Sequence, residues 1–271
     1  MGTNEIIRRR ALQSGGSAID WESIARGMLD VTTAFEVPIE INPIDFVCYM
    51  RPNLTGAVTI KNGATTIGNS SFRGSSITSV TIPNTVTRIN QQAFDGVPLT
   101  SLVIPDSVTY IDHYALRSMR QLVTIQLSRN LATLGSQVFA SSHFDAIDFP
   151  GTLAIIPSQT CDGCRSMTSL TLNEGITTIN VRAFYDCRAL PNVTVPSTVT
   201  TMGNLVFGQC FALKEVIMLP TTPPTAGPNM FLNTHADLVI YVPDASVSAY
   251  QSASNWSAYA SRIKGISERP T

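Results

Sequence analysis

The sequence is dominated by a repeat of 22 or 23 residues, of which residues 80–101, VTIPNTVTRINQQAFDGVPLTS, are the clearest copy. A unit this short cannot bury an apolar face by itself, so successive copies must stack to build a continuous core. Equivalent segments follow one another at intervals of 22, 22, 23, 22, 23, 23 and 23 residues; they begin at Val58, Val80, Leu102, Ile125, Ile147, Leu170, Val193 and Val216. The repeat therefore predicts a solenoid of about seven copies.

Five apolar columns keep their phase through the copies, and in residues 80–101 they are occupied by Ile82, Val86, Ile89, Phe94 and Leu99. Apolar residues alternate on both sides of Pro83, which predicts two short strands joined by a turn. Stacked copies would then form parallel sheets. Residues 91–96 predict a short helical turn that inserts Phe94 into the core, with Gly96 at its exit.

Residues 1–56 do not repeat. Residues 19–29 place apolar side chains at helical spacing after a capping Asp20, and residues 35–41 alternate as a strand that Pro38 restricts to an edge or a bulge. This segment is a cap for the first repeat, a docking module or both. Its candidate docking residues are Arg8, Arg9, Arg10, Trp21, Ile24 and Met28, and its apolar face also predicts a homo-oligomer formed through residues 1–56.

The composition argues against several classes of partner. Eighteen basic and nineteen acidic residues give a net charge of −1, which provides no basic stripe for nucleic acid. Charged residues make up only 14% of the chain, against ~25% in an average soluble domain, so uncharged polar side chains must keep its faces soluble. No apolar run reaches the ~18 residues that membrane insertion requires. No apolar stretch follows the N-terminal arginines, so a secretory signal is either unused or already removed.

The five cysteines include a Cys161-x-x-Cys164 spacing that is typical of zinc and redox sites. The repeat phase favours another interpretation, because Cys161 occupies the phenylalanine column of its copy. Cys164, Cys187 and Cys210 each occupy position eighteen, which predicts a ladder of buried thiols. A disulfide between neighbouring rungs and a metal site are the alternatives, and Cys48 lies outside the repeats.

No group of residues predicts catalysis. His113, His143 and His235 lie in different copies without a nucleophile at a known spacing, and Asp106, Asp112 and Asp162 are too dispersed for a calcium cage. The chain contains no phosphate-binding or dinucleotide fingerprint, so we expect no cofactor and no enzyme. A hydrolase built on the repeats would need a histidine and a carboxylate within hydrogen-bond reach.

Several arginine and aromatic side chains fall outside the core columns, and these residue types dominate interface hot spots. They form either a candidate binding surface or an ordinary solvated face. The residues are Asp112, His113, Tyr114, Arg117, Arg120, Arg165, Arg182, Tyr185 and Arg188.

The stretches VTIPNTVTRINQQAF, LVIPDSVTYIDHYAL and VTVPSTVTTMGNLVF resemble the leucine-rich repeats of the BspA-like family, and the resemblance covers residues 58–219. It implies a right-handed, β-rich α/β solenoid with no catalytic residues. Family members resemble adhesion and recognition proteins of bacterial surfaces, phages and protists. The tail is similar to the end of such arrays, which implies a final strand at residues 238–242 and a closing helix at 247–263, with Tyr250, Trp256 and Tyr259 over the last core. Copy five departs from the pattern at Ile155, Ile156, Pro157 and Cys161, so a local distortion is expected there.

The sequence thus predicts an N-terminal helical module at 1–56, a leucine-rich-repeat solenoid at 57–219 and a C-terminal strand–helix cap at 220–271. We expect a non-enzymatic recognition, adhesion or structural rod whose partner is a protein or glycan on a host or particle surface. The lack of a recognisable secretion signal or surface anchor favours a phage virion appendage or decoration protein docked through residues 1–56. The alternative is a bacterial cell-surface or secreted adhesin whose signal is absent from this sequence.

Overall fold

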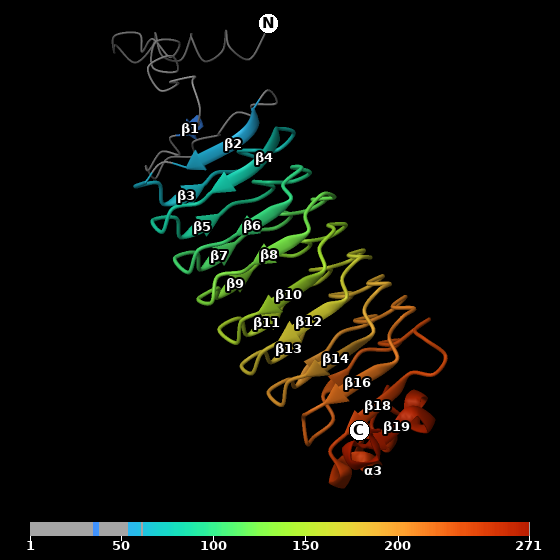
Figure 1. Ribbon diagram of the computed structural model, residues 1–271. Helices are drawn as coiled ribbons and strands as arrows, with labels where there is room; N and C mark the ends of the chain where they lie inside the picture. Colours follow the sequence, from blue (N-terminus) through green and yellow to red (C-terminus); the bar gives the residue numbers. More distant parts are fainter. Residues whose placement is uncertain (1–34, 38–53, 61, 271) are drawn as a thin grey trace, which may run out of the picture.

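The computed structural model describes residues 35–37, 54–60 and 62–270. The chain winds into a parallel β-solenoid whose turns stack along one axis, from β2 at one end to α3 at the other (Figure 1). Each turn adds one strand to a main face: β2 (Thr55–Ile60), β4 (Ser76–Thr81), β6 (Ser101–Val103), β8 (Thr124–Gln126), β10 (Ala146–Phe149), β12 (Ser169–Leu172), β14 (Asn192–Val195), β16 (Glu215–Met218) and β18 (Val239–Val242). The predicted fold class is confirmed, and the stack is longer than expected, with about nine turns.

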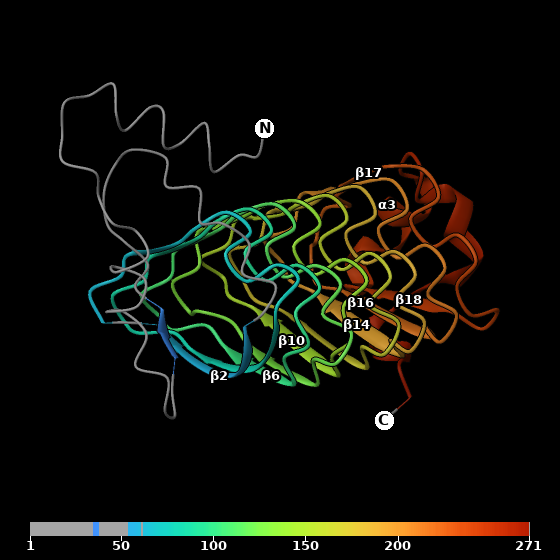
Figure 2. The ribbon, with the colours of Figure 1, turned by 90° about the horizontal axis from the view of Figure 1, so that it is seen from above.

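A second face is built from one two-residue strand in each turn. These strands are β3 (Thr66–Ile67), β5 (Arg88–Ile89), β7 (Tyr110–Ile111), β9 (Thr133–Leu134), β11 (Ile155–Ile156), β13 (Thr178–Ile179), β15 (Thr201–Met202) and β17 (Thr225–Ala226). Seen from above, successive turns follow nearly the same path around the core (Figure 2). The two faces and the turns between them therefore enclose one continuous apolar interior.

The register of the sheets matches the phase read from the sequence. Ile147 in β10 lies opposite Leu170 in β12, and Val193 in β14 lies opposite Val216 in β16, so equivalent positions of successive copies are hydrogen-bonded neighbours. All five predicted apolar columns are buried throughout the seven copies. Burial of these columns is what holds the turns together, because the strands are too short to be stable separately.

The third side of each copy differs from the prediction, because residues 91–96 form two consecutive turns rather than a helical turn. Gln92 and Gly96 adopt left-handed backbone conformations, with φ of 56° and 75°. The Phe94 N–H consequently donates to the Ala115 carbonyl of the next copy at 2.8 Å, instead of bonding within its own segment as a helix requires. The turns thus add a third line of hydrogen bonds between copies.

The two left-handed positions recur through the solenoid. The first is occupied by Ser70, Gln92, Tyr114, Gln137, Gln159, Arg182, Leu205 and Asn229, and the second by Gly74, Gly96, Ser118, Ser141, Gly163, Asp186, Gln209 and Asn233. A non-glycine residue in this region bears a conformational cost. The stacking interactions between copies must therefore offset that cost in every turn.

The distortion expected in copy five is present and has a specific cause. In other copies the residue after the second strand donates its N–H to the preceding copy; for example, Asn180 donates to the Ile156 carbonyl at 2.9 Å. Pro157 occupies the equivalent position and has no N–H. The second face is accordingly divided into two ladders, β3-β5-β7-β9 and β11-β13-β15-β17.

At the N-terminal end, β1 (Phe35–Val37) pairs in parallel with β2 and forms the edge of the sheet. This agrees with the edge strand predicted at 35–41 over its first three residues, and residues 38–41 lie outside the described part of the chain. The predicted helix at 19–29, Pro38, Cys48 and the candidate docking residues Arg8, Arg9, Arg10, Trp21, Ile24 and Met28 lie outside the described residues.

At the C-terminal end, the predicted single helix is wrong. η1 (Asp244–Ser246) leads into α3 (Val247–Ser252), and the chain continues through η2 (Ser257–Arg262) to β19 (Ile263–Gly265). Helix α3 stops because Ala253 adopts an extended conformation. Since β19 pairs with β18, β18 is not the final strand as predicted.

The predicted aromatic cap is nevertheless present. Tyr250 and Trp256 are fully buried, and they donate hydrogen bonds to the Pro220 and Pro224 carbonyls, each at 2.8 Å. Each aromatic ring thus finds a partner for its polar group while it covers the last core. Beyond β19, η3 (Ile266–Glu268) returns the Glu268 carboxylate to the Gly265 N–H at 2.9 Å, which occupies one donor of the sheet edge. No helix among the described residues is long and apolar enough to cross a membrane.

Candidate recognition surface

All nine predicted surface residues lie in the segment of their copy that follows the second strand, on the turn side of the solenoid. The structure gathers most of them around three carboxylates, two of which are buried. We call these groups the Asp95 cluster (Arg73, Asp95, Tyr114 and Arg117), the Asp162 cluster (Asp162, Arg182 and Tyr185) and the Asp186 cluster (Arg165, Asp186, Arg188 and Phe211).

The Asp95 cluster joins three consecutive copies. Arg117 binds the Asp95 carboxylate with two hydrogen bonds, Nε to Oδ1 at 3.1 Å and Nη2 to Oδ2 at 2.9 Å, and Arg73 approaches Oδ2 from the other side at 3.3 Å. The hydrogen bond with Asp95 raises the pKa of Arg117. The Arg117 guanidinium also lies 4.9 Å from the centre of the Tyr114 ring, a cation–π distance. The cluster therefore holds two arginines in defined positions.

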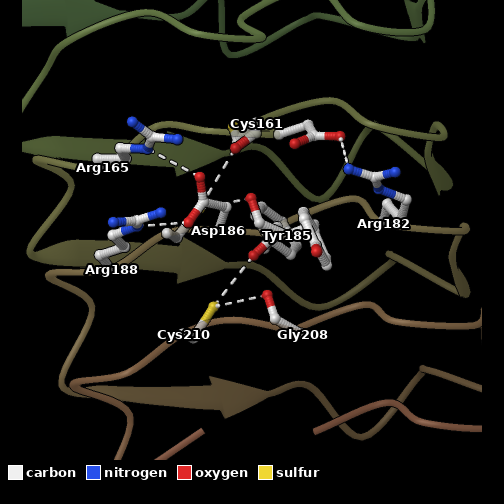
Figure 3. Close-up of polar contacts among 11 residues, drawn as sticks. Cys161, Arg165, Arg182, Tyr185, Asp186, Arg188, Gly208 and Cys210 are labelled. Atoms are coloured by element: carbon white, nitrogen blue, oxygen red, sulfur yellow. Dashed lines mark hydrogen bonds and ion pairs between the residues drawn. The ribbon is translucent and has the colours of Figure 1, made fainter. Parts of the chain in front are cut away.

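The Asp186 cluster also holds two arginines on one buried carboxylate, but here each arginine donates a single hydrogen bond (Figure 3). Arg165 and Arg188 approach Asp186 from the same side and donate through Nε, to Oδ2 at 2.8 Å and to Oδ1 at 2.6 Å. Burial opposes ionisation of this carboxyl group, but the hydrogen bonds from Arg188 and Arg165 outweigh burial and lower its pKa. Phe211 follows in the next copy, with its ring centre 5.4 Å from the Arg188 guanidinium carbon.

In the Asp162 cluster, the effect of burial on the carboxyl pKa outweighs that of the hydrogen bonds. Arg182 lies 4.0 Å from the centre of the Tyr185 ring, and its Nη2 is 3.0 Å from Asp162 Oδ2. Burial nevertheless raises the pKa of Asp162, although Gln159 and Arg182 both donate hydrogen bonds to it. Asp162 and Asp186 therefore lie in neighbouring copies with pKa values displaced in opposite directions.

The remaining predicted residues have other environments. Asp112 accepts the His113 backbone N–H at 2.7 Å, and His113 Nδ1 accepts the Ser136 N–H at 2.9 Å, so both residues support a turn. His113 Nε2 is 3.9 Å from Asp112, and His235 Nδ1 is 3.7 Å from Asp237. No histidine–carboxylate pair in the described part of the chain is thus at hydrogen-bond distance. Arg120 is exposed and lines a shallow hollow together with Gly96, Pro98, Ser118 and Gln121.

The cysteine ladder is present as predicted. Cys161, Cys164, Cys187 and Cys210 are buried free thiols, and burial raises the pKa of Cys161 and Cys187. The thiols at position eighteen donate to carbonyls of the preceding copy: Cys164 to Phe139 at 3.0 Å, Cys187 to Cys161 at 3.3 Å and Cys210 to Phe184 at 3.2 Å. Within residues 54–60 and 62–270, no group of three His, Cys, Asp or Glu residues is placed to hold a metal ion.

Sequence reasoning missed Asp95 and Asp186, the two buried carboxylates that organise the arginines. A signal was available for Asp95, because it occupies position sixteen of its copy and Arg117 occupies position sixteen of the next. A second missed signal is an added residue. Compared with a copy of 22 residues, each copy of 23 has one more residue between buried position eighteen and the last core column. Position nineteen of the longer copies is occupied by Arg120, Arg165, Arg188 and Phe211.

Comparison with known proteins identifies the class. The sequence matches the BspA type leucine rich repeat region, with six copies, over residues 42–161 and 154–253. The chain therefore belongs to the BspA-type leucine-rich-repeat family. No curated protein matches the chain at a significant level.

One solved structure shares this fold. A leucine-rich repeat protein from Bacteroides ovatus superposes with a TM-score of 0.56 at 19% identity, over 69% of this chain and 55% of that chain. This chain thus spans just over half the length of that relative. A leucine rich cell surface protein from Faecalibacterium prausnitzii matches at 22% identity over 61% of this chain and 60% of that chain, with a TM-score of 0.38.

Proposed function

We propose that this chain is a non-enzymatic recognition rod that binds a protein or glycan on a host or particle surface through its turn side. The observation that carries the proposal is the pair of arginine clusters around Asp95 and Asp186, each anchored between copies. Anchored arginines lose less conformational freedom on binding than free ones, and arginine and aromatic side chains are the usual hot spots of interfaces.

Binding of the labelled protein to intact bacterial cells, measured by flow cytometry, tests this proposal. We expect Arg117→Gln and Arg188→Gln to weaken binding, whereas Thr171→Gln, on the exposed side of main-face strand β12, should leave it unchanged. Equal loss in all three variants, or equal retention, would contradict recognition by the turn side. Thermal unfolding of each variant serves as the control for folding.

We further propose that the rod is part of a phage virion and is docked through residues 1–56. Its support is that this segment lies outside the repeat and carries an arginine run together with apolar residues at helical spacing, Trp21, Ile24 and Met28. Antibody labelling of purified virions in the electron microscope tests the location. Labelled particles are the expected result, and an antibody signal confined to bacterial envelopes would refute it.

The second candidate is a bacterial cell-surface adhesin, which the family membership favours. Recovery of the protein in the envelope fraction of uninfected cells would support this candidate. The proposed self-association through residues 1–56 has a separate test. Sedimentation velocity measures the molar masses of the full chain and of its Ile24→Glu variant, and we expect an oligomer only for the full chain. A monomeric mass for both proteins would refute self-association through residues 1–56.

A further inference from the structure

The Asp186 cluster leaves binding groups uncommitted. Arg165 and Arg188 both use Nε for Asp186, and no other described side chain or carbonyl lies at hydrogen-bond distance from their terminal nitrogens. The side chains remain 63% and 49% exposed, whereas the carboxylate between them is only 10% exposed. Each guanidinium therefore presents its outer nitrogens to solvent in a fixed orientation.

The charge and spacing of this cluster favour an anion. Two guanidiniums and one carboxylate carry a net charge of +1, and the lowered pKa keeps Asp186 ionised at neutral pH. The two arginines come from successive copies, whose strands are ~4.8 Å apart. Guanidinium groups bind carboxylate, phosphate and sulfate through paired N–H donors. A single anionic group, or two on neighbouring units of a chain, would thus fit this edge.

An apolar ring continues the same line of residues. Arg165, Arg188 and Phe211 occupy position nineteen of three consecutive copies, and Phe211 is 44% exposed. An aromatic face is suited to cover the apolar face of a flat ligand. An inorganic anion has no such face, so the ring indicates a larger ligand in which an anionic group and an apolar surface are about one copy apart.

The backbone around the cluster argues against a peptide that binds as an added strand. The Gly163 N–H donates to the Tyr185 carbonyl at 2.8 Å, and the Asp186 N–H donates to the Gly208 carbonyl at 2.8 Å, so these backbone groups already join one copy to the next. Strand addition requires open backbone donors and acceptors. The cluster therefore offers side chains rather than an open strand edge, which suits a sugar ring with a carboxylate.

We propose that Arg165, Arg188 and Phe211 form a binding site for acidic saccharides, with the guanidiniums on a sugar carboxylate and the Phe211 ring against the C–H face of a sugar. This proposal rests on the recognition function proposed above and assigns its ligand class.

Titration calorimetry of the full chain with hexagalacturonate tests the site. The methyl ester of the same oligosaccharide is the control, because it keeps the sugar rings and removes the charge. We expect binding of the acid form and loss of at least about tenfold in affinity for the ester. Arg165→Gln and Arg188→Gln should each lose about tenfold for the acid form. Arg129→Gln removes an exposed arginine from the turn between β8 and β9, away from the turn side, and should bind like the wild type.

Phe211→Ala separates the ligand classes. We expect this variant to bind hexagalacturonate more weakly than the wild type does. Its affinity for inorganic sulfate should not change, because sulfate has no ring to stack on Phe211. Failure to bind hexagalacturonate, equal binding of its ester, or an equal loss in Arg129→Gln would overturn the proposal. Tighter binding of hexaglutamate than of hexagalacturonate would overturn it in favour of an acidic peptide. If the saccharide fails while Arg117→Gln and Arg188→Gln still reduce cell binding, the ligand class is wrong and the recognition function stands.

Discussion

Replacement of Asp186 by asparagine measures how much one buried carboxylate contributes to the stability of the solenoid. The carboxylate accepts charge-assisted hydrogen bonds from Arg165 and Arg188, whereas asparagine retains one acceptor oxygen and turns an amide toward the other guanidinium. Asparagine tolerates the left-handed conformation of this position, where φ is 59°, so the backbone should not change. The comparison therefore measures the ion pairs.

The magnitude follows from the geometry. A hydrogen bond to a charged group contributes about 1.5–3 kcal/mol, and the exposure of both arginines reduces this toward the value of a surface pair. We expect Asp186→Asn to lower the free energy of unfolding by about 2 kcal/mol at pH 7. For a chain of this size, that corresponds to roughly 4–8 °C in Tm.

The pH dependence gives the sharper test. Because the pKa of Asp186 is lowered in the folded state, its stabilisation is present above the ordinary carboxyl pKa and is lost as the pH falls through the folded value. The difference in Tm between wild type and Asp186→Asn should thus be largest at neutral pH and disappear in acid.

Asp162→Asn provides the matched control in the neighbouring copy. The raised pKa of Asp162 means that its contribution to stability is greatest at low pH and is lost as the pH rises through the folded value. At pH 7, the free energy of unfolding of Asp162→Asn should therefore be no more than about 0.5 kcal/mol below that of the wild type. Calorimetric scans from pH 3 to pH 7 measure both variants. Equal destabilisation of the two, or a Tm difference for Asp186→Asn that persists in acid, would refute this reasoning.

Three further predictions concern the stack. Phe184→Ala should cost about 3–5 kcal/mol in denaturant unfolding, because the buried ring stacks on Phe207 at 5.5 Å; a cost below 1 kcal/mol would contradict a tightly packed column. Gly203→Ala should destabilise more than Gly96→Ala, since its Cβ would meet the Val181 backbone nitrogen at 2.5 Å, whereas Gly96→Ala has open space and bears only the cost of a left-handed alanine; equal Tm values would contradict this close approach. In a Cys48→Ser background, the buried thiols should react with iodoacetamide only at the rate of unfolding, and rapid labelling of the native protein by mass spectrometry would show an accessible thiol.

The repeat phase made the interior of the solenoid predictable. Each copy supplies the same apolar positions, so the sequence tests the pattern seven times, and even Cys161 could be assigned to the core. The Pro157 distortion was predictable for the same reason, because proline removes a donor that the other copies use.

The turn side was less predictable because its conformation depends on neighbouring copies. Residues 91–96 lack a local signal against a helical turn. The left-handed turns are selected by the hydrogen bonds that Gln92, Phe94 and Gly96 donate to carbonyls of the next copy. The predicted closing helix was wrong for a related reason. The chain turns away from a helix at Ala253 and Asn255, and Asn255 and Trp256 then donate hydrogen bonds to the Ala226 and Pro224 carbonyls of an earlier part of the solenoid. Asp95 and Asp186 were missed because a carboxylate inside a turn resembles a solvated residue until the arginines of adjacent copies are placed.

Hydroxyl-radical footprinting of the protein, free and bound to bacterial cells, shows whether recognition uses the turn side. We expect binding to protect Tyr114, Tyr185 and Phe211 on the turn side. Val103 on the main face, which is 58% exposed, should stay as reactive as in the free protein. Protection of Val103 with unchanged reactivity of the three aromatic residues would contradict recognition through the turn side.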